Sequence, residues 1–216
     1  MTAEVSYRLS ARMEKILHIS KEYRIAFTRI FGVAFLFLLL FSGYSWEPAL
    51  YTHLAVDIVA FILILICTFG RLWALAYISG HKTKDLITDG PYSLVRNPLY
   101  LFSLIGAVGI GLVSKNIVVF TLILMLFLIY YPFVIRAEEE HLLEVHGKAF
   151  EKYKSKTPMF FPDFKGFQEQ QYYSINARLF RRAFFSVTWF PLIYMILLVI
   201  ERLHVSGLVP VLFTVP

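Results

Sequence analysis

Cysteine and charge are both scarce in this sequence. The one cysteine, Cys67, excludes an intramolecular disulfide and any zinc site built from several cysteines. It lies within an apolar run, where we expect it to be a small buried core residue. Charged residues make up 17% of the chain, against about 25% in average soluble domains. The composition therefore argues against a soluble globular protein.

Hydrophobic residues take the place of the missing charges, at 58% of the 216 residues with a mean hydropathy of +0.64. They form blocks separated by short charged stretches, which is typical of a multi-pass membrane protein. A helix needs roughly 20 apolar residues to cross a hydrocarbon core of about 30 Å. We therefore predict an all-α integral membrane protein with about five transmembrane helices, at Ile25–Tyr44, Leu54–Ile78, Leu99–Val113, Ile117–Ile135 and Ala183–Ile200.

The predicted spans divide the chain into three parts. Residues 1–24 form a charged, amphipathic lead-in that lacks the compact basic region and small-residue cleavage site of a signal peptide, so we do not expect cleavage. Residues 25–165 hold the transmembrane core, and residues 166–216 hold an extension with the fifth helix and an apolar tail. The tail from Val205 contains Gly207 and Pro210, so we interpret it as a re-entrant or interfacial segment.

Lysine and arginine are unevenly distributed between the predicted spans. Five precede the first span, none lies in Ser45–His53, three lie in Ser79–Pro98, one in the third loop and nine in Arg136–Arg182. Positive loops face the cytoplasm, so the pattern predicts a cytoplasmic N-terminus with both longer basic segments on the same side. The formal charge of +6 indicates membrane lipids as partners and no nucleic acid, because the positive charges lie beside apolar spans.

The segment from Lys84 to Tyr100 gathers polar side chains at a membrane boundary. Gly90-Pro91 marks a turn, and Pro98 lies near the start of the third span, where a helix tolerates proline. The other polar side chains near this boundary are Tyr92, Arg96 and Asn97. From the residues alone, an interfacial loop with aromatic and arginine anchors explains the segment as well as a binding loop does.

The fourth span runs into a second polar segment, which contains Glu138, Glu139 and Glu140. Successive residues point about 100° apart on a helix, so at most one or two of these carboxylates can face any one cavity. A carboxylate at the membrane edge indicates a functional site by default, but a solvated helix start explains the row equally well.

These two segments together carry a resemblance to a known family. Gly-Pro-Tyr, then Arg-x-Pro-x-Tyr, and then an apolar helix ending in Glu-Glu-x-x-Leu resemble the isoprenylcysteine carboxyl methyltransferases and their relatives, the phospholipid N-methyltransferases. The resemblance covers Lys84 to Pro162 and implies a transmembrane methyltransferase core. It also implies S-adenosylmethionine as the cofactor and a lipid-like or lipidated acceptor, of the prenylcysteine carboxylate type, that enters from the bilayer.

The resemblance also assigns roles to residues. It implies catalytic roles for Arg96, Glu138 and Glu139. Arg136 is the arginine nearest to the family's position for binding the acceptor. The cofactor contacts that the resemblance implies are Lys84, Asp85, Leu86, Ile87, Tyr92, Asn97, Pro98, Leu99, Tyr100 and Glu138. In this interpretation Glu138 pairs with a cationic part of the cofactor, while Lys84 or Arg96 faces its carboxylate.

Two positions depart from the family pattern. Asn97 stands where the family usually has histidine, and an amide cannot hold a proton at neutral pH. Val134 stands where the eukaryotic isoprenylcysteine enzymes have a substrate-binding arginine, one helical turn before the glutamate. The cofactor is therefore better indicated than the acceptor.

Three other functions stay open. A phospholipid N-methyltransferase or a small-thiol methyltransferase would use the same cofactor with another acceptor. Membrane sterol reductases that use NADPH also resemble the Arg-x-Pro-x-Tyr stretch, but they continue with an asparagine and a Gly-Glu pair that this chain lacks. A non-enzymatic membrane scaffold is the third alternative.

Two further features lie inside the predicted spans. Gly106, Gly109 and Gly111 resemble a dinucleotide-binding loop in spacing, but no strand precedes them, so we expect them to permit close helix packing. Arg71 interrupts the second span, and it either snorkels toward the headgroups or faces a cavity.

Overall fold

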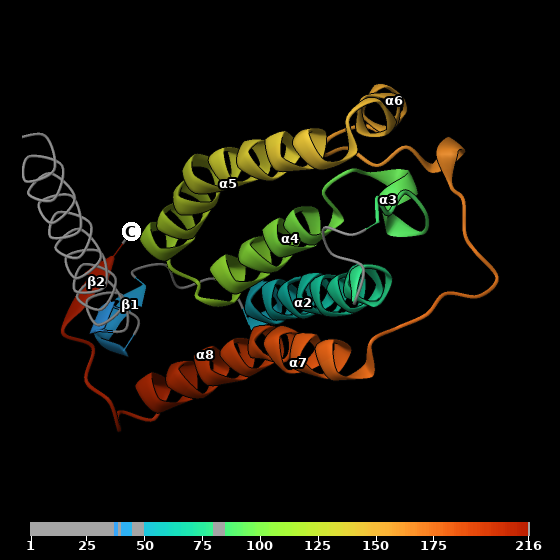
Figure 1. The fold of residues 1–216 in the computed structure, drawn as a ribbon. Helices are drawn as coiled ribbons and strands as arrows, with labels where there is room; N and C mark the ends of the chain where they lie inside the picture. Colours follow the sequence, from blue (N-terminus) through green and yellow to red (C-terminus); the bar gives the residue numbers. More distant parts are fainter. Residues whose placement is uncertain (1–36, 39, 45–49, 80–84, 216) are drawn as a thin grey trace, which may run out of the picture.

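The computed structural model describes residues 37–38, 40–44, 50–79 and 85–215, and Figure 1 shows their arrangement. In chain order the elements are β1 (Ser42–Tyr44), α2 (Leu50–Ile78), α3 (Pro91–Leu94), α4 (Pro98–Val113), α5 (Ile117–His146), α6 (Lys148–Lys156), η1 (Phe164–Gly166), α7 (Ala177–Val187), α8 (Trp189–Val205) and β2 (Phe213–Val215). Helix α4 packs against α2 and α5, while α7 and α8 pack against α2. The short elements α3, α6 and η1 lie at one end of the long helices, called here the α3 end, and β1 and β2 lie at the other, the strand end (Figure 1).

Three helical stretches are long and apolar enough to cross a membrane, namely Tyr51–Ile78, Ile117–His146 and Ala177–Val205. They contain the second, fourth and fifth of the predicted spans. Helix α4 covers the predicted third span, but its 16 residues are fewer than a bilayer crossing normally needs. The predicted first span, Ile25–Tyr44, lies largely outside the described residues. The structure therefore supports an all-α membrane protein with three helices that could cross the bilayer.

Glycines allow α4 to approach α2 closely. A Cβ atom at Gly106 would meet Cys67 Sγ at 2.5 Å, and one at Gly109 would meet the carbonyl oxygen of Ala60 at 3.1 Å. Helix association within a bilayer depends on such close van der Waals packing. The predicted packing role of these glycines is confirmed, and so is the burial of Cys67, which is fully covered.

Arg71 of α2 points toward the neighbouring helices. Its Nη1 donates to the carbonyl oxygen of Leu99 at 3.3 Å and to Ser103 Oγ, both on α4. Its guanidinium carbon lies 5.4 Å from the ring centroid of Phe190 on α8. These contacts do not fit snorkelling toward the headgroups, and facing a cavity stays a prediction, since Arg71 is not a lining residue of the cavities described below.

The C-terminal tail ends in a short strand, while its predicted re-entrant or interfacial position stays a prediction. Gly207 adopts a φ of +73° just after α8, and Pro210 follows, so the helix cannot continue. The extended chain then finds backbone partners in β1, beginning with the bond from Leu212 N to the Phe41 carbonyl oxygen at 2.9 Å. The two strands run parallel, with the paired residues Ser42 and Phe213, Gly43 and Thr214, and Tyr44 and Val215. A two-stranded ladder is thus added to the all-α prediction.

A buried ion cluster joins three segments at the strand end. The ammonium of Lys115, in the loop between α4 and α5, lies 2.9 Å from Asp57 Oδ1 on α2 and 2.6 Å from Glu201 Oε1 on α8. The Lys115 side chain is only 2% exposed. Burial opposes its charge, but the hydrogen bonds to Glu201 and Asp57 outweigh burial and raise the pKa of Lys115. The lysine therefore stays charged and ties α2 to α8.

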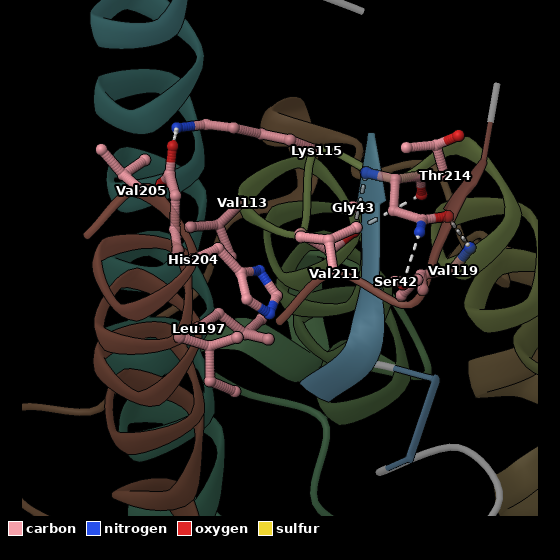
Figure 2. A pocket seen from close by; sticks show the side chains of 14 residues that line it. Ser42, Gly43, Val113, Lys115, Val119, Leu197, His204, Val205, Val211 and Thr214 are labelled. Atoms are coloured by element: carbon pink, nitrogen blue, oxygen red, sulfur yellow. Dashed lines mark hydrogen bonds and ion pairs between the residues drawn. The ribbon is translucent and has the colours of Figure 1, made fainter. Parts of the chain in front are cut away.

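A cavity of about 320 Å³ adjoins this cluster (Figure 2). Lys115 and His204 extend along its wall, and Ser42 and Val211 line the side formed by the strand segments. Its polar groups are already engaged within the protein: His204 Nε2 contacts the Leu40 carbonyl oxygen at 2.7 Å. This contact of His204 and the ion pair of Lys115 with Glu201 therefore serve the fold.

Replacing Lys115 with methionine should destabilise the protein strongly. The change leaves the half-buried carboxylates of Asp57 and Glu201, 23% and 20% exposed, without the lysine cation. Because breaking a fully buried pair costs about 3–5 kcal/mol, we expect a cost toward the lower end of that range. Lys152→Met is the matched control, because Lys152 is exposed. The measurement is the free energy of unfolding in detergent; equal values for the two variants would show that the cluster contributes nothing.

Candidate active site

A second cavity, of about 90 Å³, lies at the α3 end. It is enclosed by the end of α2, the loop before α4, the start of α4, and the ends of α5 and α6. The residues that line it are Ile78, Asp85, Leu86, Ile87, Tyr92, Arg96, Asn97, Pro98, Leu99, Tyr100, Glu138, Leu142 and Tyr153. Every described residue to which the resemblance assigns a cofactor contact is in this set.

Three of the sequence-predicted residues need separate mention. Lys84 lies outside the described residues. Glu139 and Arg136 are not part of the cavity lining, since Glu139 is buried on another side of α5 and Arg136 is exposed. A role for Arg136 in binding the acceptor stays a prediction that the geometry does not favour.

The three glutamates of α5 have three different environments. Glu138 lines the cavity, where the Tyr100 hydroxyl donates to its Oε2 at 2.7 Å. Glu139 is 7% exposed and faces the protein, while Glu140 is exposed. The 100° step between helical residues thus sends only one of the three into the cavity.

Glu139 holds the surrounding segments together through two cations. Arg96 Nε donates to its Oε1 at 3.0 Å, and Lys154 Nζ lies 3.0 Å from its Oε2. Arg96 Nη1 also donates to the carbonyl oxygens of Lys154 at 2.8 Å and Thr157 at 3.0 Å. The guanidinium is therefore engaged in joining the loop before α4 to α5 and α6, although its side chain also borders the cavity. Catalytic roles for Arg96 and Glu139 stay predictions, and this geometry indicates positioning.

Asn97 serves the same junction. It is 7% exposed, and its amide nitrogen donates to Glu139 Oε1 at 3.4 Å and to the Met159 carbonyl oxygen at 3.3 Å. Its own carbonyl oxygen accepts from the backbone of Tyr100 and Leu101 at the start of α4. Hydrogen bonding without proton transfer is sufficient for these contacts, which explains how asparagine can replace the family's histidine.

Gly90 and Tyr153 shape the loop that precedes α4. Gly90 has φ +58° and ψ −130°, and a Cβ there would lie 2.3 Å from Tyr77 Cζ, so only glycine fits. Tyr153, from α6, donates its hydroxyl to the Tyr92 carbonyl oxygen at 2.7 Å. Burial raises the pKa of both Tyr92 and Tyr153, so both hydroxyls keep their protons at neutral pH.

The segment from Pro158 to Asn176 crosses the outside of this loop, and sequence reasoning assigned it no part in the site. Gly90 N donates to the Gln168 carbonyl oxygen at 2.7 Å, and Arg96 N donates to the Pro158 carbonyl oxygen at 2.9 Å. Backbone bonds of this kind leave no sequence pattern. Of the lining residues that the sequence analysis missed, Leu142 could have been predicted, because it follows Glu138 by one helical turn and so lies on the same face of α5.

The chemistry of the lining suits a molecule with cationic, anionic and aromatic parts. Glu138 and Asp85 supply carboxylates, and Tyr92 and Tyr100 supply ring faces. S-adenosylmethionine, the cofactor that the resemblance implies, has parts of these kinds. Within the described residues, no three histidine, cysteine, aspartate or glutamate side chains gather as a metal site.

Comparison with known proteins identifies the family. The sequence profile of the family described as phospholipid methyltransferase matches residues 54–149. The nickel-cobalt-cadmium resistance protein NccN of Alcaligenes xylosoxydans xylosoxydans is 34% identical over 168 residues, which are 78% of each chain. The cobalt-zinc-cadmium resistance protein CzcN of Cupriavidus metallidurans is 30% identical over 192 residues, 89% of this chain and 88% of that protein. The chain belongs to the phospholipid methyltransferase family.

Membership in the phospholipid methyltransferase family refines the resemblance found in the sequence, which named the isoprenylcysteine enzymes first. The protein-S-isoprenylcysteine O-methyltransferase of Schizosaccharomyces pombe is 31% identical over 87 residues, only 39% of this chain and 37% of that enzyme. No solved structure is significantly similar to the chain. The family match covers α4, α5 and nearly all of α2, but it ends before most of α6 and before Pro158–Asn176.

Replacing Gly90 with alanine should loosen the cavity wall. The φ of +58° disfavours any residue with a Cβ by about 1–3 kcal/mol, and the Tyr77 ring would have to move as well. Gly166→Ala is the matched control, because its Cβ would meet only the Ser93 carbonyl oxygen at 3.6 Å. Thermal unfolding in detergent checks the prediction, and it is wrong if Gly90→Ala unfolds at the same temperature as Gly166→Ala.

Proposed function

We propose that this member of the phospholipid methyltransferase family transfers a methyl group from S-adenosylmethionine to a lipid-like or lipidated acceptor. The observation that carries the proposal is the shared cavity. Nine residues that the resemblance links with the cofactor come from three separate segments, Asp85–Tyr92, Asn97–Tyr100 and Glu138, and all nine line one space. A scaffold without a ligand has no need for this convergence.

Each lining residue has a task that its contacts suit. S-adenosylmethionine supplies a methyl group on a positively charged sulfur. Glu138 can bind a cationic part of the cofactor, and the Tyr100 hydroxyl holds that carboxylate in place. Glu138 then acts by positioning the cofactor. A carboxylate held close to the sulfonium would stabilise the charged ground state more than the transition state, in which the sulfur loses its charge. The main contribution to rate is alignment of the methyl group with the acceptor.

A third cavity supports an apolar acceptor. It encloses about 290 Å³ between α4, α5 and α8, and its lining is Ser103, Ala107, Ile110, Val119, Ile123, Phe127, Tyr131, Phe190 and Ile193. Tyr131 of this cavity contacts Tyr100 of the cofactor cavity, with ring centroids 5.3 Å apart. An acceptor with an apolar body in the α4–α5–α8 cavity could therefore present its reactive group near Tyr100.

Orientation and physiological setting follow as parts of the same proposal. The excess of lysine and arginine in Arg136–Arg182 supports a cytoplasmic α3 end.

The two bacterial relatives are named for resistance to nickel, cobalt, zinc and cadmium. For this chain we infer that any part in metal resistance would depend on methyl transfer, because the family match includes Glu138.

Glu138→Gln should weaken S-adenosylmethionine binding roughly ten- to hundredfold, since it removes one charged hydrogen-bonding partner with little change of shape. Glu140→Gln is the matched control, because Glu140 is exposed on the same helix. Calorimetric titration of the detergent-solubilised protein measures both affinities. Equal affinities would contradict the role of Glu138, and saturable binding of NADPH in place of S-adenosylmethionine would favour a reductase.

Ala107→Trp should impair transfer to long acceptors without changing cofactor affinity, because the added ring fills the α4–α5–α8 cavity. Met125→Trp is the control, since Met125 is 52% exposed on α5. The measurement is transfer from labelled cofactor to phosphatidylethanolamine, a prenylcysteine and a short alkyl thiol. Activity on the short thiol alone, unaffected by Ala107→Trp, would refute a lipid-like acceptor.

A further inference from the structure

Arg71 is a charged side chain whose partners among the described residues are all uncharged. Its guanidinium donates to two uncharged oxygens, those of Leu99 and Ser103, and lies over the Phe190 ring. No carboxylate pairs with Arg71 in the part of the chain that the structure describes, and its buried Nε has no hydrogen-bond partner there. Arginine keeps its charge in any protein environment. An ionisable residue inside a membrane-spanning helix is costly and indicates a functional site by default.

The partners of Arg71 belong to two different cavities. Leu99 lines the cofactor cavity, while Ser103 and Phe190 line the apolar α4–α5–α8 cavity. Arg71 also lies seven residues before Ile78, or about 10 Å along the helix, and Ile78 borders the cofactor cavity. Arg71 itself lines neither cavity, so its charge lies behind the residues that border the two.

We propose that Arg71 determines specificity by pairing with the anionic reactive group of the acceptor, a carboxylate or a thiolate on an apolar body. The proposal rests on the proposed methyl transfer and selects among its acceptors. A cation at this depth attracts an anion and disfavours an ammonium, so a phospholipid amine is the poorer acceptor. The chain has Val134 where the isoprenylcysteine enzymes bind their substrate with arginine, and Arg71 supplies such a cation from another helix.

The reaction balances without help from a protein base. A lone pair on the anionic oxygen or sulfur of the acceptor forms the new bond to the methyl carbon. The bond from that carbon to the sulfonium breaks, and its electron pair stays on the sulfur, which becomes a neutral thioether. No proton moves. This fits a cavity in which the tyrosine hydroxyls keep their protons and Asn97 cannot titrate.

Matched acceptors test the proposal on the full chain in lipid nanodiscs. Decanoate, decanethiol and decylamine each have a linear chain of the same number of carbon atoms and differ in the reactive group at its end. Arg71→Gln should raise the KM of decanoate and decanethiol roughly ten- to hundredfold and lower that of decylamine, because the repulsion of its ammonium is removed. Arg71→Lys should recover part of the loss, and Lys152→Gln, which removes an exposed charge, should change nothing.

Two readouts separate pairing from a structural role. With decanethiol, the pH at which the rate rises should be about one unit higher in Arg71→Gln than in the wild type, because the lost cation no longer favours the thiolate. Without cofactor, calorimetry should find tighter binding of decanoate than of decanol in the wild type and equal binding in Arg71→Gln.

The proposal is overturned if Arg71→Gln changes all three acceptors equally, or if decylamine is the preferred acceptor of the wild type. These outcomes leave methyl transfer itself intact as long as S-adenosylmethionine still binds. If the wild type binds no S-adenosylmethionine, the proposed function fails and this inference fails with it.

Discussion

The buried carboxylate of Glu139 fixes the rotation of α5, and the candidate active site depends on that rotation. Arg96 and Lys154 reach Glu139 from the loop before α4 and from α6, so replacing Glu139 with a neutral residue would leave the Arg96 side chain, which is 9% exposed, without its anion. Such a change costs several kcal/mol, whereas the intact pair adds little net stability. The contacts of Glu139 therefore matter mainly because they hold α5 in one orientation. In this orientation Glu138 faces the cavity and Glu140 faces outward.

Ionic contacts at both ends of the long helices enclose an apolar middle. At the strand end, Lys115 joins α2 to α8 through Asp57 and Glu201. Between the ends, packing depends on the shape of small residues, as where Gly106 meets Cys67. Lipid tails compete with apolar side chains, so apolarity alone does not order helices in a bilayer. Buried charges and close glycine contacts supply the order that the hydrophobic effect supplies in soluble proteins.

The sequence predicted the features that local pattern determines. Apolar runs located α2, α5 and α8, and the family resemblance indicated residues that line the cavity at the α3 end. Hydropathy ended the fourth span at Ile135, but α5 continues as one helix to His146, because charged residues with good helix propensity extend it. Contacts between distant segments left no such pattern. In the sequence, Lys115 is a single charged residue in a loop, and its partners lie 58 and 86 residues away. Which side of α5 faces the protein could not be predicted either, because it depends on the contact between Glu139 and Lys154 of α6.

Arg71 connects the two halves of the proposed reaction. The cofactor must come from water and the acceptor from the bilayer, so their spaces have to meet at a wall that is neither fully wet nor fully apolar. Tyr100 and Tyr131 form one part of that wall through ring contact, and both rings carry a hydroxyl. Arg71 lies behind another part, where it donates to the oxygens of Leu99 and Ser103. Leu99 lines the cofactor cavity and Ser103 lines the apolar cavity. Because a charge is felt more strongly in the apolar interior than in water, one arginine there can influence an acceptor group more than several surface lysines. A single position on α2 can thus set which reactive group is admitted, independently of the residues that surround the cofactor.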